Sequence, residues 1–262
     1  MKKNCIVYLV RTSEKDLDML NKSLALLDTN LLNSLKDKST VDVILFHEAS
    51  FDSEYRSCVT GLVFGNLIFK QIEFPSPPEG TPEIFPHPNP DQVAMGNLGF
   101  SVGYRHMCWF FAGGMFDQPI MEDYKYYLRL DTDSYILSPL NYDIFEMMNN
   151  GGYKYGYIEE AVQLDDPAVI SGLWDFCWKD THSIPEGTMY YTNFEVAEIE
   201  FFRSGLYYMF FKRIEANGGV YLHRWGDAPI KYLGVNILMP PQQKVAIKGF
   251  VYQHGAIYDL TK

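Results

Sequence analysis

The 262-residue sequence has few cysteines and no long apolar run, and each absence excludes a class of protein. Its four cysteines are far apart and form no C-x-x-C pair, so we expect reduced, mostly buried thiols, with neither a zinc knuckle nor a disulfide framework. No stretch of 18 apolar residues is present, so no membrane-spanning helix is predicted. The apolar segment near the start of the sequence is too short for a signal peptide, and we therefore expect a cytoplasmic protein.

Basic side chains are also scarce. Lysine and arginine number 22 against 33 aspartates and glutamates, which gives a net charge of −11. Phosphate backbones bind basic surfaces, so nucleic acid is not an expected partner. An acidic protein that binds an anionic ligand needs a local positive site, which a metal ion and a few arginines supply. The sequence contains no Walker loop, no G-x-G-x-x-G motif and no internal repeat.

The composition is 47% apolar and 16% aromatic, which is sufficient for one large core. We expect residues 1–262 to form a single domain. Aromatic side chains pack on the faces of sugar rings, as in a sugar-binding cleft, but they are also ordinary core residues. Composition alone leaves both uses open.

Strands and helices alternate in the first seventy residues, which predicts an α/β fold with a parallel sheet. In such sheets ligands bind beyond the carboxyl ends of the strands, and Arg11 follows the first predicted strand. Strands are predicted over residues 5–10, 41–46 and 67–74. Leucines spaced three and four apart predict a helix over 17–27, and a second helix is predicted over 51–63.

Two acids follow a buried strand predicted over residues 126–130. If Asp131 and Asp133 continue that strand, its period of two places both carboxylates on one face. Neighbouring carboxylates repel each other unless a cation lies between them, and their hard oxygens suit Mn²⁺ or Mg²⁺. The alternative is a polar strand end at which Asp133 begins a turn. Because these two acids and Arg11 all lie at predicted strand ends, we expect them to share one crevice.

Two segments that precede these acids carry further predictions. Residues 75–90 contain seven prolines, which exclude a helix or a central strand and predict a rigid surface loop. A helix is predicted around Tyr104 and Arg105. An arginine in so apolar a segment requires an anion, either an internal acid or a ligand phosphate, and the sequence does not decide between them.

Three later residues each have a structural and a functional interpretation. Asn193 resembles a helix N-cap, which predicts a helix over 193–217. Glu195 would lie in its first turn, either as a charge that the helix end favours or as a catalytic carboxylate. Asp227 either caps a helix over 229–238 or is presented in a tight turn. His254 follows an apolar strand, where it ligates a metal or closes a turn.

These segments, in this order, resemble the fungal α-1,2-mannosyltransferases of glycosyltransferase family 15. The most specific block is R-W-G-D-A-P with the Gly-Gly that precedes it, which chance rarely produces. The matching blocks are residues 104–108 (YRHMC), 126–133 (YYLRLDTD), 193–196 (NFEV), 201–204 (FFRS) and 218–229.

The resemblance implies a GT-A fold, GDP-mannose as donor, Mn²⁺ as cofactor and retention of anomeric configuration. Asp131 and Asp133 occupy the place of the family's E-P-D motif, and His254 matches its late metal-binding histidine. Glu195 matches the glutamate proposed as nucleophile or cation stabiliser, and Asp227 an aspartate that orients or deprotonates the acceptor hydroxyl. The positions expected to line the nucleotide and phosphate pocket are Arg11, Tyr104, Arg105, Arg129, Asp131 and Asp133.

The sequence also departs from the family. Members are usually Golgi type II membrane proteins with an amino-terminal anchor and stem, and no such segment is present here. The family's C-H-F-W pattern before Asn193 is replaced by residues 187–192 (GTMYYT), which leaves the glycan acceptor open. Two alternatives remain: the same fold with another donor, such as a UDP-sugar or GDP-fucose, and a non-catalytic carbohydrate-binding protein.

Overall fold

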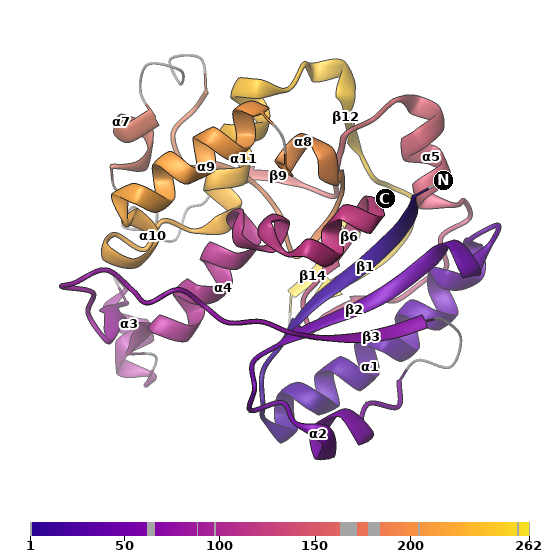
Figure 1. Cartoon of the computed structure of the whole chain (residues 1–262), viewed down its shortest axis with the longest axis horizontal. Helices are drawn as coiled ribbons and strands as arrows, with labels where there is room; N and C mark the ends of the chain where they lie inside the picture. Colours follow the sequence, from indigo (N-terminus) through magenta and orange to yellow (C-terminus); the bar gives the residue numbers. More distant parts are fainter. Residues whose placement is uncertain are drawn as a thin grey trace.

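A seven-stranded mixed sheet organises the computed structural model, which describes residues 2–61, 66–87, 89–96, 98–162, 172–177, 184–203, 205–255 and 257–261 (Figure 1). Four neighbouring pairs of strands run parallel, and only β11 runs antiparallel to both of its neighbours. In spatial order the strands are β12 (Lys244–Ala246), β8 (Tyr155–Tyr157), β11 (Phe194–Glu198), β6 (Tyr124–Leu130), β1 (Lys3–Val10), β2 (Val41–His47) and β3 (Asn66–Gln71).

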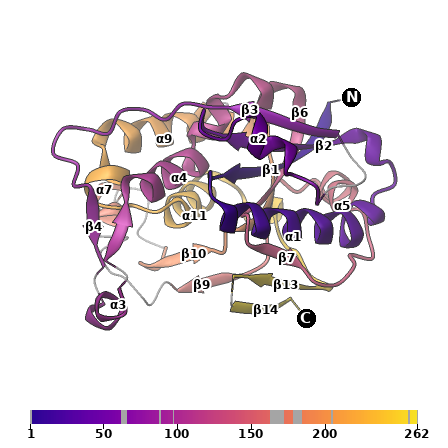
Figure 2. The ribbon, with the colours of Figure 1, turned by 90° about the horizontal axis from the view of Figure 1, so that it is seen from below.

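The sheet is covered on both faces because successive side chains of its strands enter two different cores. In β1, Cys5 and Val7 belong to one apolar cluster, whereas Ile6 and Tyr8 belong to the other. Helix α1 (Glu14–Asn30) contributes to the second cluster and α4 (Val102–Ala112) to the first. Figure 2 shows these two helices at different sides of the strands, with α9 (Gly205–Asn217) and α11 (Asp227–Leu238) near α4.

Smaller sheets complete the fold, and one of them matters for the site. Strand β13 (Phe250–His254) lies between β7 (Ser134–Ile136) and β14 (Ile257–Thr261), and its register pairs His254 with Ser134. The end of the chain therefore returns to the segment that follows β6. The other two small sheets pair β9 (Glu160–Val162) with β10 (Thr188–Tyr190), and β4 (Ile84–Pro86) with β5 (Gly99–Ser101).

The remaining helices are short. They are α2 (Ser53–Ser57), α3 (Pro90–Ala94), α5 (Ile144–Gly151), α7 (Leu173–Cys177), α8 (Ile199–Arg203) and α10 (Gly219–Leu222), with 3-10 turns at Leu32–Ser34, Lys38–Thr40, Gly114–Asp117, Pro119–Asp123 and Pro241–Gln243. None of the helices in the described ranges has the length and apolarity needed to cross a bilayer. All four cysteines are free thiols, and three of them are buried.

Most predicted elements are confirmed, and two are wrong. The predicted helix over 193–217 begins as strand β11, because Phe194 and Val196 insert between β6 and β8; α8 and α9 follow, and Ser204 lies outside the described residues. The helix predicted over 51–63 shrinks to α2, and residues 62–63 are likewise outside the described part. Of the proline-rich segment 75–90, the described residues form a loop that contains the short strand β4, and Pro90 begins α3.

The Gly-Gly that precedes R-W-G-D-A-P has a packing reason. Gly218, the N-cap residue of α10, has a φ of +74°, a left-handed conformation that suits glycine. A Cβ on Gly219 would collide with the ring of Trp225, which is 3% exposed. The two glycines thus let the backbone turn tightly over Trp225 immediately before α11, and they fix where Asp227 begins that helix.

Candidate functional site

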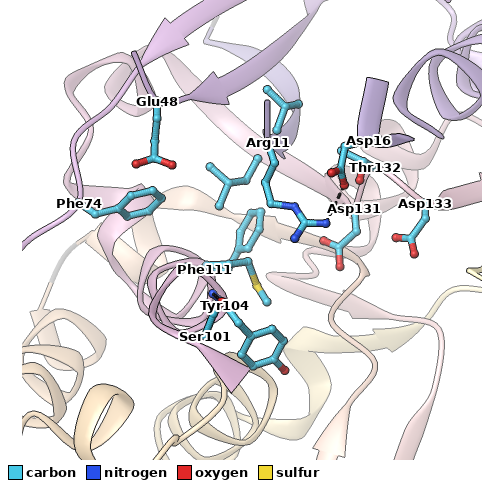
Figure 3. Close-up of a pocket in the computed structure, with 14 residues that line it drawn as sticks. Arg11, Asp16, Glu48, Phe74, Ser101, Tyr104, Phe111, Asp131, Thr132 and Asp133 are labelled. Carbon is cyan, nitrogen blue, oxygen red and sulfur yellow. Dashed lines mark hydrogen bonds and ion pairs between the residues drawn. The ribbon is translucent and has the colours of Figure 1, made fainter. Parts of the chain in front are cut away.

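A cavity of about 330 Å³ opens beyond the carboxyl ends of three adjacent strands, as expected for a sheet of this kind (Figure 3). Arg11 follows β1, Glu48 follows β2, and residues 131–133, which we call the acid turn, follow β6. The opposite wall comes from the first turns of α4, which supply Tyr104 and Met107.

A second cavity of about 220 Å³ adjoins the first. The two share Tyr104, Met107 and Asp131 in their walls, so they form one cleft with two compartments. The first, on the side of β1 and β2, we call the strand-end compartment. The second is lined by residues 189–193, by residues 226–229 at the start of α11, and by Arg129 and His254, and we call it the α11 compartment.

The structure brings Asp131, Asp133 and His254 together, as the sequence predicted, but for a different geometric reason. The two acids lie in the turn between β6 and β7 and not in a strand, so strand alternation does not align them. The pairing of β13 with β7 brings in the imidazole instead. Its Nε2 lies 3.2 Å from Asp133 Oδ1 and 3.7 Å from Asp131 Oδ2.

The charges of this trio are coupled. Burial by itself would lower the pKa of His254, but the hydrogen bond to Asp133 and the charges of Asp131 and Asp133 outweigh it, so the pKa of His254 is raised. The hydrogen bond from His254 is in turn the main reason why the pKa of Asp133 is lowered. The imidazole of His254 thus lies between the carboxylates of Asp131 and Asp133 at the edge of the cleft.

Two carboxylates and an imidazole suit Mn²⁺ or Mg²⁺ in chemical type. Within the described ranges, however, no three His, Cys, Asp or Glu side chains are arranged so that they could hold a metal ion by themselves. A cation bound at the acid turn would therefore take further ligands from a bound molecule or from water. The donor set fits a metal that binds together with an anionic ligand.

Arg129 connects the acid turn to α11. Its side chain is 2% exposed, and its guanidinium lies 3.6 Å above the ring of Phe111. Nε donates to Asp131 at 3.0 Å, and Nη1 donates to Asp227 at 2.5 Å. Burial opposes its charge, yet these two acids raise the pKa of Arg129. Arg129 lines the α11 compartment, and its charge is committed to two internal acids.

Asp227 is the first residue of α11 and is 6% exposed. Burial would raise its pKa, but Arg129 outweighs this and the pKa of Asp227 is lowered. Its Oδ2 also accepts a hydrogen bond of 3.0 Å from Thr192. Gly226, not Asp227, occupies the N-cap position, so helix capping does not explain the aspartate. It is an ionised carboxylate in the wall of the α11 compartment.

Glu195 lies one layer below the cleft, in β11 and not at the start of a helix. It is fully buried and lines neither compartment. Tyr127 donates to Oε1 at 2.9 Å and Tyr155 donates to Oε2 at 2.7 Å, while Lys231 forms an ion pair with Oε1. In the strand register Glu195 pairs with Arg129, whose charge it helps to stabilise.

Lys231 is a residue of this network that the sequence interpretation missed. It is fully buried in α11, and burial lowers its pKa more than Glu195 raises it. Its signal in the sequence was a single lysine in an otherwise apolar helical segment, four residues after Asp227. Such a lysine needs a buried partner, but the sequence offers several acids, from the nearby Asp227 to the more distant Glu195, and does not choose between them.

Of the other residues predicted to line the pocket, Tyr104 and Arg11 do so and Arg105 does not. Tyr104 lines both compartments, and Arg11 lines the strand-end compartment, where its 80% exposed side chain forms an ion pair with Asp16 at 2.8 Å. Arg105 is fully buried and lines neither. Its guanidinium donates to the carbonyl oxygens of residues 82, 83 and 221, so the expectation that it needs an anion is wrong.

A comparison with known families identifies this arrangement. The sequence model of glycosyltransferase family 15, described as glycolipid 2-alpha-mannosyltransferase, matches residues 1–186 and 179–262, which together span the chain. The chain belongs to this family.

Relatives from Saccharomyces cerevisiae are similar along most of the chain. Probable mannosyltransferase KTR3 is 28% identical, over 96% of this chain and 66% of its own length, and alpha-1,2 mannosyltransferase KTR1 is 27% identical, over 90% and 64%. The chain thus spans about two thirds of the length of these curated relatives.

Solved structures show the same fold. Core-mannan synthase A from Aspergillus fumigatus, in a Mn/GDP form, gives a TM-score of 0.80 at 20% identity, over 98% of this chain and 76% of that chain. The mannosyltransferase Ktr4p from S. cerevisiae in complex with GDP gives 0.78 at 20% identity, over 98% and 72%. The predicted GT-A fold is confirmed.

The buried pair of Glu195 and Lys231 can be tested by stability. Replacing one member leaves a buried charge without its partner, so Glu195→Gln and Lys231→Met should each lower the free energy of unfolding by about 3–5 kcal/mol. The double variant, in which neither charge remains, should lose clearly less than the sum. Urea denaturation of the four proteins measures this, and simple additivity of the two losses would show that the residues do not interact.

The coupling of His254 to the two acids predicts a pH dependence in protein treated with a chelator. Because the folded pKa of His254 is raised, its protonated form stabilises the fold below the ordinary pKa of about 6.5, and this contribution disappears as pH rises through the folded value. The Tm of the wild type minus that of His254→Gln should therefore be larger at pH 5.5 than at pH 8.5. A difference that grows with pH would contradict the ion pair.

Proposed function

We propose that this chain transfers mannose from GDP-mannose to a sugar hydroxyl, with a divalent metal ion and with retention of configuration. The observation that carries the proposal is the meeting of Asp131, Asp133 and His254 at the edge of a cleft with two compartments. Family membership supports the reaction class, and the Mn/GDP form of core-mannan synthase A supports the cofactor and the nucleotide. A glycan that offers the hydroxyl is the second substrate.

The strand-end compartment is the proposed donor site. Asp133, Asp131 and His254 would hold Mn²⁺, or Mg²⁺, which would neutralise the donor diphosphate and make GDP a better leaving group. Arg11 adds an exposed positive charge at the same rim, and Tyr104 closes the opposite wall. The need for an additional ligand at the acid turn explains why metal and nucleotide should bind together.

The α11 compartment is the proposed acceptor site, with Asp227 as the residue that receives the acceptor hydroxyl. Arg129 keeps Asp227 ionised, and its lowered pKa makes it a weak proton acceptor. We therefore assign Asp227 the task of accepting a hydrogen bond from the hydroxyl and orienting its oxygen. A phosphate oxygen of the departing diphosphate is then the better site for the proton.

In our proposal Glu195 acts indirectly, by stabilising Arg129, and does not contact the sugar. A direct attack on the anomeric carbon would take its carboxylate away from Tyr127, Tyr155 and Lys231, and would leave Lys231 buried without a partner. Its negative charge instead stabilises Arg129, which holds both acids of the cleft. Retention then follows from departure of the diphosphate and arrival of the acceptor on the same face of the sugar.

The direct test is release of GDP from GDP-mannose, first without an acceptor and then with a panel of mannosides. We expect Mn²⁺ to support release and a chelator to abolish it. Asp133→Asn should lower the rate by about 100-fold or more, because it weakens the charge that holds the metal and the diphosphate. Asp18→Asn, the same change on an exposed face of α1, is the matched control and should leave the rate unchanged.

UDP-sugars and GDP-fucose belong in the same assay. Faster turnover of one of these donors would replace GDP-mannose in the proposal while keeping the reaction class. Binding of nucleotide sugars and mannosides without any release of nucleotide, with Mn²⁺ present, would contradict transfer altogether.

A further inference from the structure

The strand-end compartment has a second charged end, which the proposed chemistry leaves unused. Val10 of β1 pairs with His47 of β2, so the next residues, Arg11 and Glu48, are neighbours at the carboxyl ends of these two strands. Figure 3 shows Glu48 at one end of the compartment, the acid turn at the other, and Arg11 between them. Adjacent strands lie about 4.8 Å apart, so the strand that carries Glu48 is roughly 10 Å from the strand that carries the acids.

The surroundings of Glu48 are those of a flat, apolar ligand group. Leu9, Val10 and Phe74 line the same compartment, and the half-buried ring of Phe74 is backed by His106, stacked at 4.6 Å and 12°. The ring therefore stands as a fixed aromatic wall beside the carboxylate. A wall of this kind is suited to the face of a nucleobase.

The backbone of Glu48 is held in place while its carboxylate is left available. Its carbonyl oxygen accepts hydrogen bonds from His47 Nδ1–H at 2.8 Å and from the backbone N–H of Phe51 at 3.1 Å. His47 is fully buried, so the segment is anchored in the core. Across the described ranges, no hydrogen bond or ion pair engages the Glu48 carboxylate, which is exposed toward the compartment.

The different charges at the two ends of the compartment determine the orientation of a bound nucleotide. A phosphate is repelled by the lone carboxylate of Glu48, whereas the acid turn with a bound cation attracts it. A nucleoside diphosphate therefore fits one way only, with its phosphates at the acid turn, its ribose near Arg11 and its base between Phe74 and Glu48.

We propose that Glu48 selects guanine. This inference rests on the proposed function, in which the donor is a nucleoside diphosphate sugar. The Watson–Crick edge of guanine presents N1–H and an N2 amino hydrogen side by side, and an ionised carboxylate accepts both. Uracil flanks its single N–H with two carbonyl oxygens, and adenine presents a bare ring nitrogen. Both of these edges place acceptors against the carboxylate, which is unfavourable.

The selection of guanine by Glu48 can be tested by calorimetry, which measures the binding of nucleoside diphosphates in the presence of Mn²⁺ and without a sugar substrate. Inosine diphosphate is the sharp probe because its base lacks only the N2 amino group. One hydrogen bond to a charged group corresponds to about 10-fold or more in affinity, so wild-type protein should bind GDP at least about 10-fold more tightly than inosine diphosphate. UDP should bind about 100-fold more weakly than GDP or worse.

Glu48→Gln is the decisive variant, since its amide group would meet the N2 amino group of guanine donor to donor. GDP should lose about 10-fold or more in affinity, inosine diphosphate much less, and the preference between them should disappear. Glu54→Gln, an equivalent change on the neighbouring exposed helix α2, should retain the preference. Asp133→Asn should weaken both nucleotides equally and also leave the preference intact.

Each failure has a different meaning. If Glu48→Gln binds GDP and inosine diphosphate with the wild-type ratio, Glu48 does not recognise the base, whatever the enzyme transfers. If the ratio collapses in Glu48→Gln although GDP-mannose is never turned over, base selection stands and the proposed reaction fails. Tighter binding of UDP than of GDP by the wild type would overturn the assignment of guanine.

Discussion

A buried guanidinium determines how the cleft of this protein is built. Arg129 lies at the end of β6 and holds Asp131 of the acid turn with one edge and Asp227 of α11 with another. Without it, two carboxylates would lie close together in a half-buried wall, at a cost of several kcal/mol. Because both acids bind one rigid side chain, the proposed metal end and the proposed acceptor end keep a fixed separation.

The charges below the cleft continue the same pattern. Glu195 is paired with Arg129 across the strands and with Lys231 from α11, and two tyrosines satisfy its oxygens. Cations and anions thus alternate from Lys231 to the acid turn, where His254 completes the series. Such a network is costly to bury, and it is retained in a core that apolar residues could have filled more cheaply. Its position directly below the cleft is the best argument that it serves the site.

The sequence allows the periodic elements to be predicted, but not the ones that depend on distant partners. Strands β1 and β2 and helices α1 and α4 follow from apolar spacing that is local. Strand β11 was mistaken for a helix, because Asn193 resembles an N-cap and only pairing with β6 and β8, about 40 to 70 residues away, decides its state. The acids and His254 were connected through resemblance to a family; spacing alone favoured a turn at His254. Arg105 and Lys231 could not be assigned from local pattern, since their partners come from other elements.

The central claim is that a cation and a nucleotide diphosphate bind together at the acid turn, with the base toward β2. Crystals grown with Mn²⁺ and GDP and measured at the manganese absorption edge test it most directly. We predict an anomalous peak within coordination distance of Asp133 and His254, with the diphosphate beside it and guanine between Phe74 and Glu48. A manganese peak away from the acid turn, or a nucleotide bound outside the strand-end compartment, would contradict the account.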